Sequence, residues 1–233
     1  MSLREIAFDT ETTGFYYNKD DRVIEIGCVE LINHLPTGNT FHAYINPQRD
    51  VPPGASKVNG LTTEFLLDKP LFMHVVDPFL DFIQDSPLII HNASFDMGFM
   101  NAEFNRLCRP TLPMERAIDT LAMARQKFPG SPGSLDALCR RFNIDLTERG
   151  THSAILDAQL LAKVYLELIG GRQVSFAFNN EANAENQSGT ATSSLHRDRP
   201  LRPSRNFTVS PEELSSHEAF LKGIKAPLWD NVT

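Results

Sequence analysis

The chain contains no apolar run that approaches the roughly 18–20 residues needed to cross a bilayer, so the sequence predicts no membrane-spanning helix. Its first residues, Met1–Ile6, run directly into a strand-like pattern. They lack the basic stretch followed by an apolar stretch that is typical of a secretory signal. We therefore expect a cytoplasmic protein that does not act at a membrane.

Cysteine and positive charge are also scarce. The three cysteines, Cys28, Cys108 and Cys139, form no cluster with metal-ligand spacing, and we expect small buried hydrophobic residues at these positions. Lys and Arg total 22 against 29 Asp and Glu, which gives a net charge of −7. This balance argues against tight binding along a nucleic-acid backbone, but it is compatible with an enzyme that grips a short strand end through metal ions.

The composition changes after Phe178. Residues 179–206 contain no aromatic side chain and only scattered Ala and Leu among Asn, Ser, Thr, Arg and Pro. Such a segment cannot bury enough apolar surface to offset the entropy lost on ordering. The sequence therefore predicts a globular domain over 1–178, a flexible linker over 179–206 and a short terminal segment over 207–233.

The terminal segment carries a helix-start signal. Ser210 is a suitable N-cap, Pro211 fits the first helical position, and Glu213 fits the third. Apolar side chains follow, including Leu214, Phe220 and Trp229. The segment is too short for a core of its own, so it either docks onto a partner or folds back on the domain.

The globular part has the pattern of an α/β domain. Strands are expected over 4–11, 23–31 and 40–45, with a turn at 36–39, and the short connections favour an antiparallel meander. A short buried strand is expected over 87–91. Helices are expected over 72–84, 94–107, 120–128, 135–142 and 154–169. This order predicts a mixed β-sheet flanked by helices.

Two acids on the first strand need an explanation. Side chains alternate along a strand, so Asp9 and Glu11 share one face, roughly 6–7 Å apart. Two like charges at this spacing repel each other unless a cation lies between them. They also lie at the strand's carboxyl end, because Thr12, Thr13 and Gly14 turn the chain, and that edge is the usual ligand crevice of open α/β sheets. The alternative is a solvated strand end.

Three further residues are ambiguous to different degrees. Asp96 lies in the first turn of a helix, where it could simply complement the helix dipole. Asp157 lies on the same helix face as Leu160, Leu161 and Val164, where an unpaired charge would be costly. His152 precedes that helix and could be an exposed surface histidine or a neighbour of Asp157.

Together these residues have the composition of a metal site for hard cations. Carboxylate ligands without cysteine favour Mg²⁺ or Mn²⁺ over structural zinc. Spread over one strand and two helices, the acids suit two cations that clamp the attacking and leaving oxygens of a phosphodiester. His152 could then take a proton from the attacking water.

Three segments carry a resemblance to a known family. Phe8–Gly14, His91–Asp96 and His152–Ala158 resemble, in order, the three exonuclease motifs of the DnaQ-like DEDDh superfamily. More narrowly, the chain resembles the proofreading subunits of bacterial DNA polymerase III, including at Asp119–Ala122 and Ser134–Cys139. The resemblance implies a ribonuclease-H-like fold and a 3′–5′ DNA exonuclease that releases 5′-mononucleotides from a mismatched 3′ end.

The resemblance also implies roles for particular residues. The catalytic residues would be Asp9, Glu11, Asp96, His152 and Asp157, with the four acids holding two Mg²⁺ or Mn²⁺ ions. Asp9 would bridge both ions, Glu11 and Asp157 would hold the ion that activates water, and Asp96 would support the second. The terminal nucleotide of the DNA would meet Thr10, Thr12, Thr13, Asn59 and Phe95. Many relatives carry His where this chain has Asn59, so we expect weaker substrate holding here.

Two segments resemble partner-binding elements of the same family. Gln173–Phe178, with Gln173, Phe176 and Phe178 as contacts, is similar to a peptide that binds the sliding clamp, although it could also be a final strand or a core-packing tail. The segment around Leu214, Phe220 and Trp229 resembles the part that docks on the alpha subunit of DNA polymerase III.

Two other functions remain possible from the sequence. One is an RNA-trimming exonuclease of the same superfamily, against which the linker and the aromatic tail argue. The other is a catalytically inactive scaffold with the exonuclease fold, against which the intact set of acids argues.

Overall fold

The computed structural model describes residues 2–147, 150, 152–170 and 209–223. Contacts within the chain divide it into two units, 1–178 and 179–233. Each unit is described by itself. No helix of the described residues is long and apolar enough to cross a membrane.

The first unit is built on a five-stranded mixed sheet with the strand order β3-β2-β1-β4-β5. Its strands are β1 (Arg4–Thr12), β2 (Val23–Ile32), β3 (Leu35–Tyr44), β4 (Leu88–Ile90) and β5 (Ala117–Asp119). β1, β2 and β3 pair antiparallel, whereas β4 pairs parallel to β1 and β5 parallel to β4. The predicted meander and the mixed sheet are therefore confirmed.

The predicted position of the turn between β2 and β3, residues 36–39, is wrong. The turn lies at Asn33 and His34, both with positive φ, and residues 36–39 belong to β3. Asn tolerates this left-handed conformation, and two such residues form a tight hairpin turn. Pro36 can sit in β3 because that strand is at the edge of the sheet.

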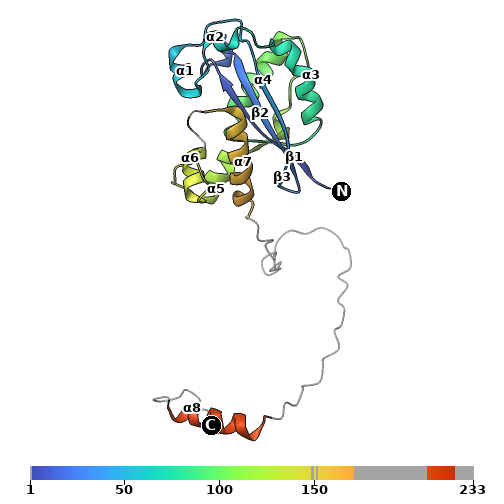
Figure 1. Cartoon of the computed structure of the whole chain (residues 1–233). Helices are drawn as coiled ribbons and strands as arrows, with labels where there is room; N and C mark the ends of the chain where they lie inside the picture. The colour runs from blue at the N-terminus through green and yellow to red at the C-terminus, as the bar shows by residue number, and fades with distance from the viewer. Residues whose placement is uncertain (1, 148–149, 151, 171–208, 224–233) are drawn as a thin grey trace, which may run out of the picture. The chain divides into compact units, whose positions relative to one another are not determined.

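Helices cover both faces of the sheet (Figure 1). The helices of the first unit are α1 (Pro53–Asn59), α2 (Thr63–Leu66), α3 (Phe72–Ile83), α4 (Ala93–Arg106), α5 (Thr120–Lys127), α6 (Leu135–Arg141) and α7 (Ala154–Leu168). One core joins Ile6 and Phe8 to α3 and α4, and a second joins Ala7 to α5, α6 and α7. The alternation expected along β1 is therefore confirmed, and it places Asp9 and Glu11 on the side of α7.

The main helices follow the expected ranges closely, but short elements were missed. α1, α2 and β5 have seven, four and three residues, which is too little sequence for a clear periodicity. Of the cysteines, Cys28 and Cys139 are buried as expected. Cys108 is exposed, because it lies just past the end of α4 in a turn with a φ of 54°.

The described part of the second unit is α8 (Pro211–Lys222). Its start confirms the predicted helix signal. The Ser210 side chain accepts a hydrogen bond from the Glu213 backbone N–H, and the Glu213 side chain accepts one from the Ser210 backbone N–H. This reciprocal pair satisfies two backbone donors that a bare helix end leaves unpaired.

Candidate active site

A pocket of about 490 Å³ opens at the carboxyl end of β1. Every residue predicted to be catalytic or to bind the terminal nucleotide lines it. They are Asp9, Thr10, Glu11, Thr12, Thr13, Asn59, Phe95, Asp96, His152 and Asp157. The structure thus brings together residues that lie up to 148 positions apart, because strand β1 and the starts of α4 and α7 meet at this edge.

Asp9 and Glu11 project from one face of β1 toward the start of α7. Their partners on β2 are Gly27 and Glu25. A side chain at Gly27 is excluded, because an added Cβ would lie 2.2 Å from the Ala154 backbone carbon. This close approach seats the start of α7 directly on β2, beside Asp9.

The position of the Asp96 side chain is fixed by hydrogen bonds from β1 as well as by its own helix, α4. Asp96 is 3% exposed, and its Oδ1 accepts hydrogen bonds from the backbone N–H of Thr10 (3.0 Å) and from the Thr10 hydroxyl (2.6 Å). These donors come from a strand 86 residues away, so Asp96 does more than complement the dipole of α4. Burial raises the pKa of Asp96 to about 7, although both Thr10 hydrogen bonds act in the opposite direction.

Asp157 and His152 form a pair at the start of α7. Asp157 is 4% exposed, and its Oδ2 lies 3.1 Å from Nδ1 of His152. His152 is itself exposed, and its backbone N–H donates to the Val58 carbonyl oxygen at 3.2 Å. Ligand atoms of Glu11, His152 and Asp157 all lie within 4.8 Å of one another, a spacing that could hold a metal ion.

The electrostatics of the pocket favour a bound cation. The pKa of Asp9 is raised well above its ordinary value, first by burial and then by the charges of Asp96, Asp157 and Glu11. Each of these acids disfavours the ionised form of Asp9. A divalent cation would reverse this effect, and carboxylate oxygens are the ligands that Mg²⁺ and Mn²⁺ prefer. The residues present therefore fit such ions.

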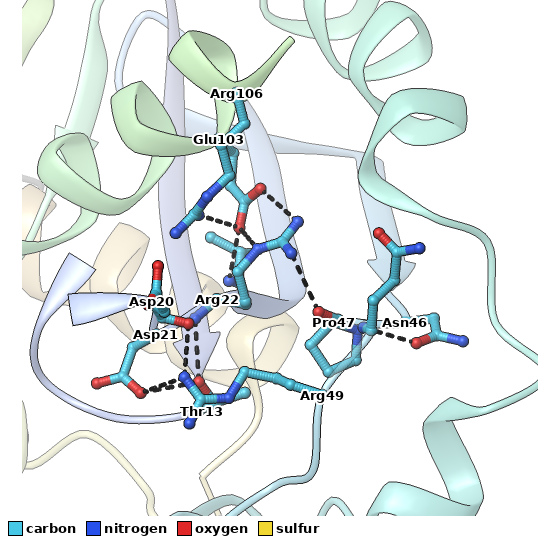
Figure 2. A network of polar contacts seen from close by, with 11 residues as sticks. Thr13, Asp20, Asp21, Arg22, Asn46, Pro47, Arg49, Glu103 and Arg106 are labelled. Atoms are coloured by element: carbon cyan, nitrogen blue, oxygen red, sulfur yellow. Dashed lines mark hydrogen bonds and ion pairs between the residues drawn. The ribbon is translucent and has the colours of Figure 1, made fainter. Parts of the chain in front are cut away.

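The loop between β1 and β2 lines the pocket, and hydrogen bonds between its two ends hold it in place. Thr13 donates its backbone N–H to the Arg22 carbonyl oxygen, and the Arg22 N–H donates to the Thr13 hydroxyl. The Arg22 guanidinium forms two hydrogen bonds, of 2.6 and 2.9 Å, with Glu103 of α4, which is 2% exposed (Figure 2). This network ties the loop to the helix that carries Asp96.

Asn59 lies at the end of α1, is 5% exposed and lines the pocket. Its Oδ1 accepts a hydrogen bond from the Leu61 backbone N–H at 3.0 Å, and its Nδ2 lies 3.5 Å from the Thr12 carbonyl oxygen. The side chain is therefore partly engaged by its own loop.

Several lining residues were not predicted. Phe15 and Tyr16 are exposed at 76% and 56%, and Asp21 binds the backbone N–H of Tyr16 at 3.0 Å. Three adjacent aromatic residues right after the first motif, Phe15 to Tyr17, were the available signal. Buried Glu25 of β2 does not line the pocket, but it pairs with Glu11 across the strands, and its charge adds to the raised pKa of Asp9. It was also missed, because a single acid within an apolar strand does not reveal its neighbour on the next strand.

The predicted partner residues fall mostly outside the described part of the chain. This is the case for Gln173, Phe176, Phe178 and Trp229. Leu214 and Phe220 belong to α8 and are 49% and 67% exposed.

Comparisons with known proteins identify the family. A model of the exonuclease family matches residues 6–165. DNA polymerase III subunit epsilon of Rickettsia felis is 47% identical, over 96% of this chain and 97% of the relative. The subunit of the same name from Escherichia coli K12 is 46% identical, over 94% and 92%.

Solved structures show the same fold. Exonuclease X, in complex with 5′ overhanging duplex DNA, superposes with a TM-score of 0.55 at 26% identity, over 72% of this chain and 90% of that one. The nuclease domain of 3′hExo, a DEDDh family member bound to rAMP, superposes with a TM-score of 0.62 over 72% and 92%. That match, at 17% identity, shows the fold alone. The expected exonuclease fold, a mixed sheet flanked by helices, is confirmed. The chain belongs to the exonuclease family and, within it, to the epsilon subunits of bacterial DNA polymerase III.

Proposed function

We propose that the pocket at the end of β1 is the active site of a 3′–5′ DNA exonuclease that proofreads for a replicative polymerase. It would remove mismatched 3′-terminal nucleotides as 5′-mononucleotides. The convergence of Asp9, Glu11, Asp96, Asp157 and His152 on this one pocket is the observation that carries the proposal. Its volume of about 490 Å³ lies in the range typical of small-molecule sites and suits one nucleotide.

The carboxylates would hold two divalent cations, Mg²⁺ or Mn²⁺. Asp9 would contact both, Glu11 and Asp157 would hold the ion nearer His152, and Asp96 would hold the other. When bound, the ions would lower the pKa of the attacking water and stabilise negative charge on the scissile phosphate. The raised pKa of Asp9 and Asp96 supports this assignment, because it marks a site that needs positive charge.

His152 would act as the general base. In the neutral ring, an Nδ1–H that donates to Asp157 Oδ2, at the observed 3.1 Å, leaves Nε2 able to accept the proton of the attacking water. Asp157 would then orient the ring as well as hold a cation. The exposure of His152 lets this proton leave to solvent.

Thr10, Thr12, Thr13, Asn59 and Phe95 would contact the terminal nucleotide, since all of them line the same pocket. α8 would dock on the alpha subunit of DNA polymerase III, and the exposed Leu214 and Phe220 support a binding role. The clamp-binding role of Gln173–Phe178 is proposed from its sequence alone.

The test is nucleotide release from single-stranded DNA. The full chain should release 5′-mononucleotides with Mg²⁺ or Mn²⁺ and none with a chelator, and Asp9→Ala and His152→Ala should each reduce the rate by at least about a hundredfold. Activity that survives either substitution would mean that the site is wrong. A strong preference for RNA over DNA would favour the RNA-trimming alternative, and inactivity of the unaltered chain would favour a scaffold.

A further inference from the structure

A second pocket, of about 590 Å³, shares part of its wall with the first. Asp9, His91, His152 and Asp157 line both pockets. The scissile phosphate should lie beside three of these shared residues, because Asp9 and Asp157 are proposed cation ligands and His152 is the proposed base. Hydrolysis there splits the strand into a released nucleotide and a remaining strand. With the terminal nucleotide in the first pocket, the second pocket is available for the remaining strand, because it opens at the same residues.

The walls of the second pocket are fastened together by hydrogen bonds. The Asn92 backbone N–H donates to Asp119 Oδ1 at 3.1 Å, and His91 Nδ1 lies 3.0 Å from the Thr120 hydroxyl. Asp119 also caps α5 by accepting from the N–H of Leu121. These hydrogen bonds hold the segment before α4 against the start of α5, and they therefore fix the shape of this side of the pocket.

Arg125 gives the second pocket its positive charge. It lies in the last turn of α5, is exposed, and forms no ion pair with any residue that the structure describes. Among the described residues that line either pocket, it is the one Lys or Arg. It lines this pocket together with His91, one of the four shared residues.

The other charged residues of this pocket are acids. Asp9 and Asp157 belong to the proposed cation site. Asp136 also lines the pocket, and its Oδ2 lies 4.0 Å from the exposed Arg140 guanidinium. Arg125 therefore remains as the cation that can meet an anion entering from solvent.

We propose, on the basis of the function above, that the second pocket binds the nucleotide next to the scissile bond and that Arg125 contacts the phosphodiester on its 5′ side. An arginine suits this role because its guanidinium can donate two parallel hydrogen bonds to phosphate oxygens. The chain has a net charge of −7, which argues against a broad basic surface. A single arginine beside the active site would make the phosphate contact instead.

The experiment compares two substrates with the full chain. One is a single-stranded oligodeoxynucleotide. The other is the p-nitrophenyl ester of thymidine 5′-phosphate, which has the terminal nucleotide and the scissile phosphate but p-nitrophenolate in place of the upstream strand. Arg125→Ala should lower kcat/KM for the oligonucleotide by about tenfold, mainly through KM, and leave the ester within about twofold. The loss of one phosphate contact should also reduce the salt slope of kcat/KM by about 0.7.

Two controls separate binding from a structural effect. Arg125→Lys keeps the charge and should recover part of the oligonucleotide rate. Lys163→Ala removes an exposed cation that lines neither pocket and should change neither substrate. Equal losses on both substrates for Arg125→Ala, or no loss on the oligonucleotide, would overturn the Arg125 assignment alone. An unaltered chain that cleaves neither substrate would overturn the proposed function and this inference with it.

Discussion

At the scale of single residues, the site depends on how one buried carboxylate is held. Asp96 Oδ1 accepts both hydrogen bonds from Thr10, and the hydroxyl bond is the shorter at 2.6 Å. Thr10 therefore orients Asp96 from the opposite element. The geometry links the pocket-lining backbone at the end of β1 to a proposed metal ligand on α4.

Thr10→Val tests this link, because it removes the hydroxyl and keeps the shape. A buried acceptor that loses a donor costs about 1–3 kcal/mol, so we expect kcat to fall by about tenfold or more and the Mg²⁺ requirement to rise. Thr10→Ser, which keeps the hydroxyl, should stay close to the unaltered enzyme. Equal Mg²⁺ titrations for the Val and Ser variants would contradict the role.

The raised pKa of Asp96 predicts how metal-free stability depends on pH. Its folded pKa of about 7 lies above the unfolded value, so the folded state binds the extra proton between the two. With chelator present, the contribution of Asp96 to thermal stability should be complete below its unfolded pKa and should fall as the pH rises from there through about 7. Mg²⁺ should raise Tm more at pH 8 than at pH 6. Asp96→Asn should flatten this dependence, and an unchanged profile in that variant would speak against the assignment.

Residue patterns alone identified only part of the site. Asp9, Glu11 and Asp157 were suspicious because strand alternation and helix periodicity place them on buried or shared faces. Asp96 and His152 stayed ambiguous, because their partners Thr10 and Val58 lie 86 and 94 positions away. The motif resemblance placed them in the site, and Arg125 and Glu25 were missed by both.

At the scale of elements, α7 is held at both ends by buried carboxylates. The Ser153 hydroxyl donates to Glu25 of β2 at 2.8 Å, beside His152. At the other end, the Tyr165 hydroxyl donates to Glu5 of β1 at 2.7 Å. Only the first of these bonds lies next to the proposed catalytic residues.

These two bonds form a matched pair for a test. Ser153→Ala should lower kcat several-fold with little change in KM, because the segment that carries His152 loses its bond to β2. Tyr165→Phe should cost about 1 kcal/mol of unfolding free energy and leave kcat unchanged. Both variants need urea unfolding curves and steady-state kinetics. A kcat that falls equally in both would show that only overall stability matters.

The long elements were predictable because each offers enough sequence for a pattern to be recognised, and in α3 the hydrophobic periodicity is strong. The β2–β3 turn was misplaced because Pro36 to Asn39 have turn composition, whereas the tight turn at Asn33 and His34 depends on backbone angles that the pattern does not reveal. α1, which carries Asn59, was missed because its packing rather than its short sequence stabilises it.

At the scale of the whole molecule, catalysis and polymerase binding are assigned to separate parts of the chain. All residues of the proposed site belong to the unit 1–178, whereas α8 belongs to the unit 179–233. Deletion of residues 211–233 should therefore abolish binding to the polymerase alpha subunit and leave nucleotide release from single-stranded DNA unchanged. Pull-down and exonuclease assays on the same preparation check this, and a truncated chain that still binds would show that α8 is dispensable.

The most direct measurement is release of a mismatched 3′ nucleotide from a primer–template by the full chain assembled with the DNA polymerase III alpha subunit and Mg²⁺. The account predicts that the mismatched nucleotide leaves as a 5′-mononucleotide, faster than a matched one, and that Asp9→Ala abolishes its release. A mismatched end that stays intact, or a product other than the 5′-mononucleotide, would contradict the central claim.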